Sequence, residues 1–78
     1  MISEIKIIMA DILQADVNEI ETASYGKLPN WDSMRHFLLI IALEELWKCE
    51  LNDAEAAKLN SFNEIKKYYE KKIKLEEL

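Results

Sequence analysis

The chain has few of the residues that break helices or cross-link a fold. Its 78 residues include one glycine, one proline and one cysteine. Because glycine and proline punctuate tight turns, their scarcity argues against a turn-rich sheet protein, and the many leucines, isoleucines, alanines, glutamates and lysines favour helices. Cys49 cannot form an internal disulfide and has no companion at metal-ligand spacing, which fits a reducing compartment best. We therefore expect an all-α, cytoplasmic protein.

The chain also lacks long apolar runs and an excess of basic residues. No stretch approaches the roughly 18 apolar residues of a membrane span, and the N-terminal residues have no basic segment before an apolar run. Fifteen acidic residues against ten basic ones give a net charge of −5, which repels nucleic acid and anionic membranes. We expect protein partners with positive docking faces, no nucleic-acid or membrane partner, and a monomer.

Side chains that could build an active site are scarce. His36 is the single histidine, so a catalytic triad would need Ser33, His36 and Asp32 from one helical turn, where they cannot form the required line. A chain this short buries only about 60% of its unfolded surface, which disfavours a deep active site. We expect no enzyme. His36 is interpreted as a surface or interfacial residue, with a direct functional role as the alternative.

Apolar residues recur at helical spacing in three segments, separated by polar stretches. The pattern predicts long helices over 3–13, 34–47 and from Phe62 onward, a short helix over 54–59, and a loop over 14–31. Ser3 is the expected N-cap of the first helix, and Asn52 or Asp53 that of the short one. Ser61 and Glu64 have the spacing of a capping box.

One domain, 1–78, is expected, with an ordered core over about 2–72 and a tail, 73–78, that frays. Apolar side chains of the long loop are expected to anchor it to the core: Val17, Ile20, Tyr25 and Leu28. On the central helix the expected core residues are Phe37, Leu39, Ile40, Leu43, Leu46 and Trp47.

The segment from Leu28 to Glu45 reads LPNWDSMRHFLLIIALEE. It resembles the attachment region of the acyl and peptidyl carrier protein family, in which Asp-Ser-Leu or Asp-Ser-Met opens the second helix and Leu-Glu-Glu follows nearly three turns later. The resemblance covers nearly the whole chain and implies a four-helix bundle. It identifies Ser33 as the attachment residue for 4′-phosphopantetheine, donated from coenzyme A by a phosphopantetheinyl transferase (holo-carrier synthase).

Helix physics supports Ser33 independently, because unpaired N–H groups and the positive end of the helix dipole favour a phosphate at a helix start. The alternative is that Ser33 is only an N-cap. Asp32 is a second possible cap, and the resemblance implies that it also contacts the transferase and its metal. Trp31 and Met34 flank the attachment residue, so shielding of the arm and simple packing remain alternatives for both.

The resemblance also implies a docking face on the second helix, used by enzymes that load and transfer acyl or aminoacyl groups. The residues expected there are Arg35, Leu38, Ile41, Glu44 and Glu45. Arg35 and Leu38 stand where fatty-acid carriers usually show acidic residues, and a Trp-Asp-Ser-Met sequence followed by His36 looks like stand-alone carriers of specialised pathways. The Leu-Gly-x-Asp-Ser lead-in that is common in the family is replaced here by Pro29-Asn30-Trp31-Asp32-Ser33, so the flexible glycine is missing.

The resemblance therefore implies a carrier that delivers thioester-linked acyl or aminoacyl intermediates to the enzymes of a specialised biosynthetic pathway. The alternative is an unmodified helical module that binds a partner through its acidic surface. A small nucleic-acid-binding domain conflicts with the charge of the chain.

Overall fold

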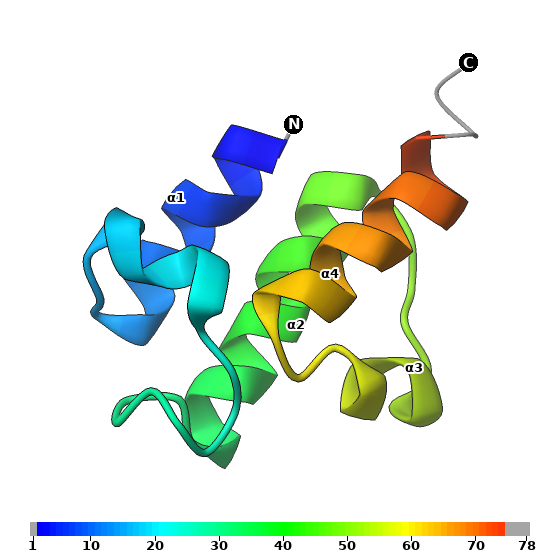
Figure 1. The fold of residues 1–78 in the computed structure, drawn as a ribbon. Helices are drawn as coiled ribbons and strands as arrows, with labels where there is room; N and C mark the ends of the chain where they lie inside the picture. The colour runs from blue at the N-terminus through cyan, green and yellow to red at the C-terminus, as the bar shows by residue number, and fades with distance from the viewer. Residues whose placement is uncertain (1, 75–78) are drawn as a thin grey trace.

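The computed structural model describes residues 2–74, and over this range the chain is helical (Figure 1). The elements in order are α1 (Ile2–Leu13), the 3₁₀ helix η1 (Val17–Thr22), α2 (Ser33–Trp47), α3 (Asp53–Lys58), α4 (Phe62–Tyr68) and the π-helical turn η2 (Tyr69–Ile73). Because η2 continues α4 without a break, three long helices and one short helix result. The expected all-α bundle is confirmed.

Three of the four helix starts have a capping side chain where one was predicted, including Asp32 at the start of α2. The Asn52 side chain accepts from the Glu55 N–H at 2.8 Å and Glu55 accepts from the Asn52 N–H at 3.1 Å, which makes a complete capping box for α3. The Ser61 hydroxyl accepts from the Glu64 N–H at 3.1 Å and caps α4. The expectation for Ser3 was wrong, because α1 begins at Ile2 and Ser3 lies inside its first turn.

The core lies where the three long helices and η1 meet. Its buried side chains are Ile5, Met9 and Leu13 from α1, Ile20 from η1, Leu39, Ile40, Leu43 and Trp47 from α2, Phe62 and Ile65 from α4, Tyr69 and Ile73 from η2, and Ala23, Trp31 and Leu59 from the connections. Ile73 extends this core one residue past the expected boundary. The remaining tail residues 75–78 lie outside the described part of the chain.

One core assignment on α2 is corrected by the structure. Phe37 was expected inside, but 62% of its surface is exposed. Leu39, Ile40, Leu43 and Trp47 are buried as expected, and Leu46 is half-buried. The helix has apolar residues on more than one face, so spacing alone does not decide which of them turn inward.

Fewer apolar side chains than expected anchor the loop before α2 to the core. Ile20 is fully buried and Leu28 is half-buried, whereas Val17 and Tyr25 are exposed. Gly26 has a φ of +89°, a backbone region that favours glycine, and lies in the turn that leads the chain back towards α2. The loop therefore reaches the start of α2 through Leu28 and the buried Trp31.

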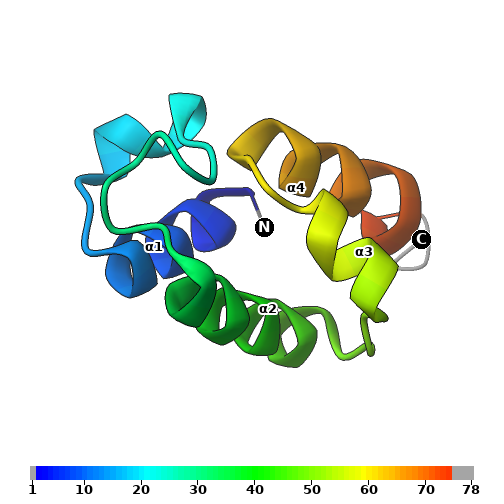
Figure 2. The ribbon, with the colours of Figure 1, turned by 90° about the horizontal axis from the view of Figure 1, so that it is seen from below.

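α3 differs from the other helices because none of its residues is buried. It lies beside α4 (Figure 2), and a hydrogen bond between His36 and the Ala56 carbonyl joins it to the first turns of α2. Among residues 2–74, no helix is long and apolar enough to cross a membrane.

Candidate functional site

Ser33 is the first residue of α2 and is exposed. This start of α2 is the lower end of the helix in Figure 1. The residue before it supplies the cap, because the Asp32 carboxylate accepts from the Arg35 N–H at 2.9 Å. The alternative in which Ser33 is only an N-cap is therefore wrong. Ser33 instead presents its hydroxyl to solvent at the positive end of a 15-residue helix.

A chain of hydrogen bonds runs from the lead-in loop through α2 to α3. The Trp31 indole N–H donates to Nδ1 of His36 at 3.0 Å, and Nε2 of His36 lies 2.9 Å from the carbonyl oxygen of Ala56. An indole nitrogen only donates and a carbonyl only accepts, so Nδ1 is the acceptor and Nε2 bears the proton. Both ring nitrogens are used, which leaves His36 no nitrogen for acid–base chemistry in this arrangement.

Trp31 packs in the core and is not an exposed neighbour of Ser33. Only 2% of its surface is exposed, and its ring stacks on His36 with centroids 6.0 Å apart. Tyr25 meets the same His36 ring edge-on, with centroids 5.7 Å apart. Met34, on the other side of Ser33, is 67% exposed and is therefore the flanking residue that solvent reaches.

Two shallow grooves meet at Ser33 and His36. One, of about 310 Å³, runs between α2 and α3 and is mainly apolar in its middle. Its lining residues are Ser33, His36, Phe37, Ile40, Ile41, Glu44, Leu51, Asp53 and Ala56. The other, of about 260 Å³, is lined by Tyr25, Ser33, His36, Ala57 and Asn60. Both grooves therefore adjoin Ser33, and the imidazole of His36 lines each of them.

The outer face of α2 carries a stripe of exposed apolar side chains. Met34, Phe37, Leu38 and Ile41 are 67%, 62%, 45% and 37% exposed, and their spacing places them in one row beginning next to Ser33. This apolar stripe contains the expected docking residues Leu38 and Ile41. The sequence reasoning missed Phe37 as a member, although the i, i+3, i+4, i+7 spacing was visible.

Two of the charged residues expected on the docking face are tied into the scaffold. Nη1 of Arg35 donates to the Ile12 carbonyl oxygen at 2.7 Å, near the C-terminal end of α1, and the side chain is half-buried. The Glu44 carboxylate accepts from the Leu51 N–H at 2.8 Å and is also half-buried. Glu45 is exposed, as expected. Arg35 thus adds no free cation to the apolar stripe.

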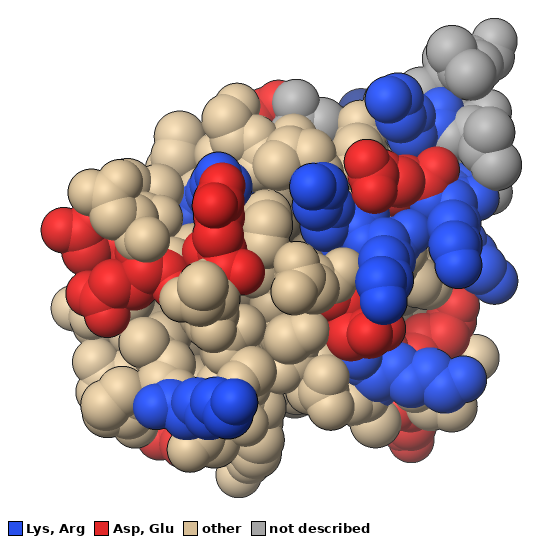
Figure 3. Space-filling view, viewed as in Figure 1, with Lys and Arg blue, Asp and Glu red and all other residues tan. Residues whose placement is uncertain are grey.

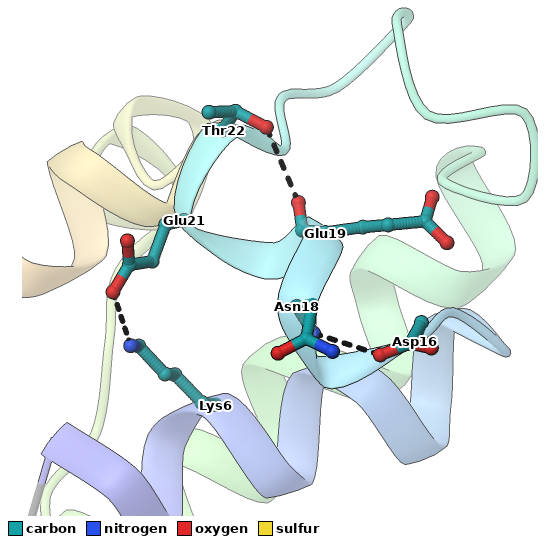
Figure 4. A network of polar contacts seen from close by, with 6 residues as sticks. All are labelled: Lys6, Asp16, Asn18, Glu19, Glu21 and Thr22. Atoms are coloured by element: carbon teal, nitrogen blue, oxygen red, sulfur yellow. Dashed lines mark hydrogen bonds and ion pairs between the residues drawn. The ribbon is translucent and has the colours of Figure 1, made fainter.

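Charge is unevenly distributed over the surface. In Figure 3, lysines gather over α4 and η2, and carboxylates gather over η1. Lys6 of α1 pairs with Glu21 of η1, and this partner lowers the pKa of the Glu21 carboxyl (Figure 4). Asp16 caps η1 by accepting from the Asn18 N–H at 2.9 Å. These contacts fix η1 on α1 and leave the acidic surface on the side of the molecule away from the lysines.

The chain was compared with known proteins. No protein-family model matches it. A curated relative named Acyl carrier protein, from Thermosynechococcus vestitus, is 32% identical over 74 residues, which cover 94% of this chain and 91% of the relative. The chain belongs to the acyl carrier protein family. This relationship supports a carrier role and does not favour the alternative of an unmodified acidic interaction module.

Several features of this carrier had no signal in its sequence. Nothing in the spacing of Trp31, His36 and Ala56 predicts their hydrogen bonds, because Ala56 contributes only its backbone carbonyl. The bond from Arg35 to Ile12 joins residues 23 positions apart and likewise depends on how α1 packs against α2. Such contacts follow from tertiary packing and not from local pattern.

Proposed function

We propose that this carrier works through a 4′-phosphopantetheine arm attached to Ser33. The observation that carries the proposal is an exposed serine at the first position of α2, behind the Asp32 cap, in a chain of the acyl carrier protein family. In attachment, the Ser33 oxygen forms a bond to the pantetheine phosphate of coenzyme A, and the nucleotide part leaves. The base and the Mg²⁺ come from a phosphopantetheinyl transferase, with Asp32 at the contact.

The residues around Ser33 suit such a group. A phosphodiester there lies at the positive end of α2, which stabilises an anion by roughly 0.3–1 kcal/mol. The hydroxyl is accessible to another enzyme, and the two grooves beside it leave space for a long flexible chain. The arm would supply a thiol that holds the cargo as a thioester, while this chain supplies the attachment point and the docking surface.

Partner enzymes dock on the outer face of α2, next to the arm. The apolar stripe of Met34, Phe37, Leu38 and Ile41 offers desolvation energy, and Glu45 adds a carboxylate that attracts basic patches. The partners are enzymes that load and transfer acyl or aminoacyl groups. Leu38 is apolar at a position where general fatty-acid carriers usually have an acidic residue. This difference supports the proposal that the carrier delivers its cargo to a dedicated set of enzymes in a specialised biosynthetic pathway.

The first test is incubation with coenzyme A, Mg²⁺ and a promiscuous phosphopantetheinyl transferase, followed by intact mass spectrometry. We expect a gain of one 4′-phosphopantetheinyl group. A chain that stays unmodified under conditions that convert another acyl carrier protein fully would contradict the proposal.

The dedicated enzyme set is tested separately with malonyl-loaded carrier and the enzymes of fatty-acid synthesis. Wild type should be a poor substrate, and Leu38→Glu should improve turnover because it restores a carboxylate for their basic patches. The matched control is Glu45→Gln, which removes the exposed carboxylate one helical turn beyond Ile41 on the same face. Wild-type turnover equal to that of a general carrier would refute the specialised assignment.

A further inference from the structure

α3 is held in place by polar contacts more than by burial. None of its six residues is buried, and three of them are alanines, whose side chains offer little apolar surface. Two side-chain hydrogen bonds join it to neighbouring helices. His36 of α2 donates to the Ala56 carbonyl at 2.9 Å, and the Tyr68 hydroxyl of α4 donates to the Glu55 carboxylate at 2.8 Å. Besides the packing of the half-buried Ala56 and of the buried Leu59 that follows α3, these two bonds fix the position of α3.

The His36 ring that donates this hydrogen bond to α3 is itself held in place. Trp31 is 2% exposed within the core, and its indole N–H fixes the His36 ring through Nδ1 at 3.0 Å. With this nitrogen occupied, the imidazole can turn little without breaking a part-buried hydrogen bond. The ring thus links the core, through Trp31, to the backbone of α3.

The same ring stands beside the attachment residue. His36 follows Ser33 by one helical turn, and both line each of the two grooves. Each groove is also lined by one alanine of α3, Ala56 in the larger and Ala57 in the smaller. A displacement of α3 away from α2 would therefore change the width of both grooves at once.

We propose that His36 is a positioning residue that holds α3 against the first turns of α2 and so sets the grooves in which an arm on Ser33 lies. The proposal rests on the proposed attachment at Ser33. It assigns His36 no part in phosphate transfer or thioester chemistry, because both ring nitrogens serve the scaffold. Cargo on the arm is shielded to the extent that α3 stays in place.

The test compares two variants of the carrier. In His36→Asn, the amide oxygen can replace Nδ1 as acceptor for Trp31, but the side chain is too short to reach Ala56. Ser61→Ala is the control, because it removes the α4 cap and costs about 0.5–2 kcal/mol of stability without touching α3 or the grooves. Loading with the arm is first checked by intact mass.

Two rates are then measured on each form: amide hydrogen exchange at 54–59, and cleavage of an octanoyl thioester on the arm by hydroxylamine. We expect His36→Asn to raise both by about fivefold, the factor that one lost hydrogen bond corresponds to. Ser61→Ala should leave the thioester rate unchanged.

Unchanged exchange in α3 would show that His36 does not hold this helix, and faster exchange with unchanged thioester cleavage would show that α3 does not set the grooves. Either result overturns the proposal.

If no arm can be attached, the proposed function fails, while exchange at 54–59 in the unmodified protein still tests the link to α3. If His36→Asn does not fold, ring nitrogen NMR of wild type decides, since a proton on Nδ1 would contradict the hydrogen-bond chain.

Discussion

α1 and α3 both flank α2, but they are held against the bundle by different forces. α1 buries Ile5, Met9 and Leu13 completely, and Arg35 binds a carbonyl near its C-terminal end. α3 has no fully buried residue, packs on the core through the half-buried Ala56, and is joined to α2 and α4 by hydrogen bonds from His36 and Tyr68. Apolar burial is lost only when a helix separates completely, whereas one hydrogen bond can open locally. The start of α2 thus lies between α1, which apolar burial holds in place, and α3, which can open locally.

The largest effect is expected from the core of α1. Leu13→Ala removes a fully buried side chain and should lower the free energy of unfolding by about 2–5 kcal/mol. Urea denaturation followed by circular dichroism measures this loss. Lys58→Ala, on the exposed end of α3, is the comparison and should stay within about 0.5 kcal/mol of wild type. Equal effects of the two substitutions would remove the distinction between the two helices.

A smaller effect is expected where α2 holds the end of α1. Arg35→Met keeps most of the aliphatic stem but loses the charged donor to the Ile12 carbonyl, so unfolding should become easier by about 1–2 kcal/mol. Arg35→Lys should recover part of this loss, because an ammonium group can also donate. If Arg35→Met is neutral in urea denaturation, the guanidinium does not help to fix α1.

The smallest effect concerns the acid response of α3. Hydrogen bonds from the Asn52 backbone and the Tyr68 hydroxyl hold the pKa of Glu55 below its ordinary value of 4.5. A lowered pKa in the folded state contributes stability above the ordinary value, and that contribution is lost as pH falls through the folded-state pKa. Glu55→Gln should therefore be less stable at neutral pH and should lose less stability on acidification.

The measurement is urea denaturation of wild type and Glu55→Gln at pH 7 and at about pH 3. The free energies of unfolding of wild type and variant should be closer to each other at the lower pH than at pH 7. A gap between wild type and variant that widens on acidification would contradict the sign of the Glu55 contribution.

The sequence predicted those features of the bundle that depend on local chemistry. Helix-forming composition, apolar spacing and the caps at Asp32, Asn52 and Ser61 are all encoded within a few residues of where they act. Ser33 could be identified as the candidate site residue in the same way, from the residues next to it in the sequence. Its exposure at the first position of α2 was also expected, because a helix start at the molecular surface follows from the loop before it.

Features that depend on which helix faces which could not be predicted from the sequence. Phe37 and Leu39 are both apolar and lie on the same helix, yet only Leu39 is buried. The choice is made by the positions of α1 and α4. Arg35 was likewise expected on the exposed docking face and His36 at the surface or an interface. Their partners, the carbonyls of Ile12 and Ala56, could not be predicted, because they are backbone groups from distant segments. Every residue has a backbone carbonyl, so the sequence does not show which carbonyl accepts a hydrogen bond from a side chain.

The proposed attachment at Ser33 is tested most directly by measuring arm attachment to Ser33→Ala and Ser61→Ala beside wild type. Both substitutions remove a hydroxyl at a helix start, but Ser61 caps α4 whereas Asp32 performs that role for α2. Ser33→Ala should keep the stability of wild type within about 0.5 kcal/mol and accept no phosphopantetheine. Ser61→Ala should be less stable and still be modified. Attachment that persists in Ser33→Ala, with the modified peptide elsewhere in the chain, would contradict the account.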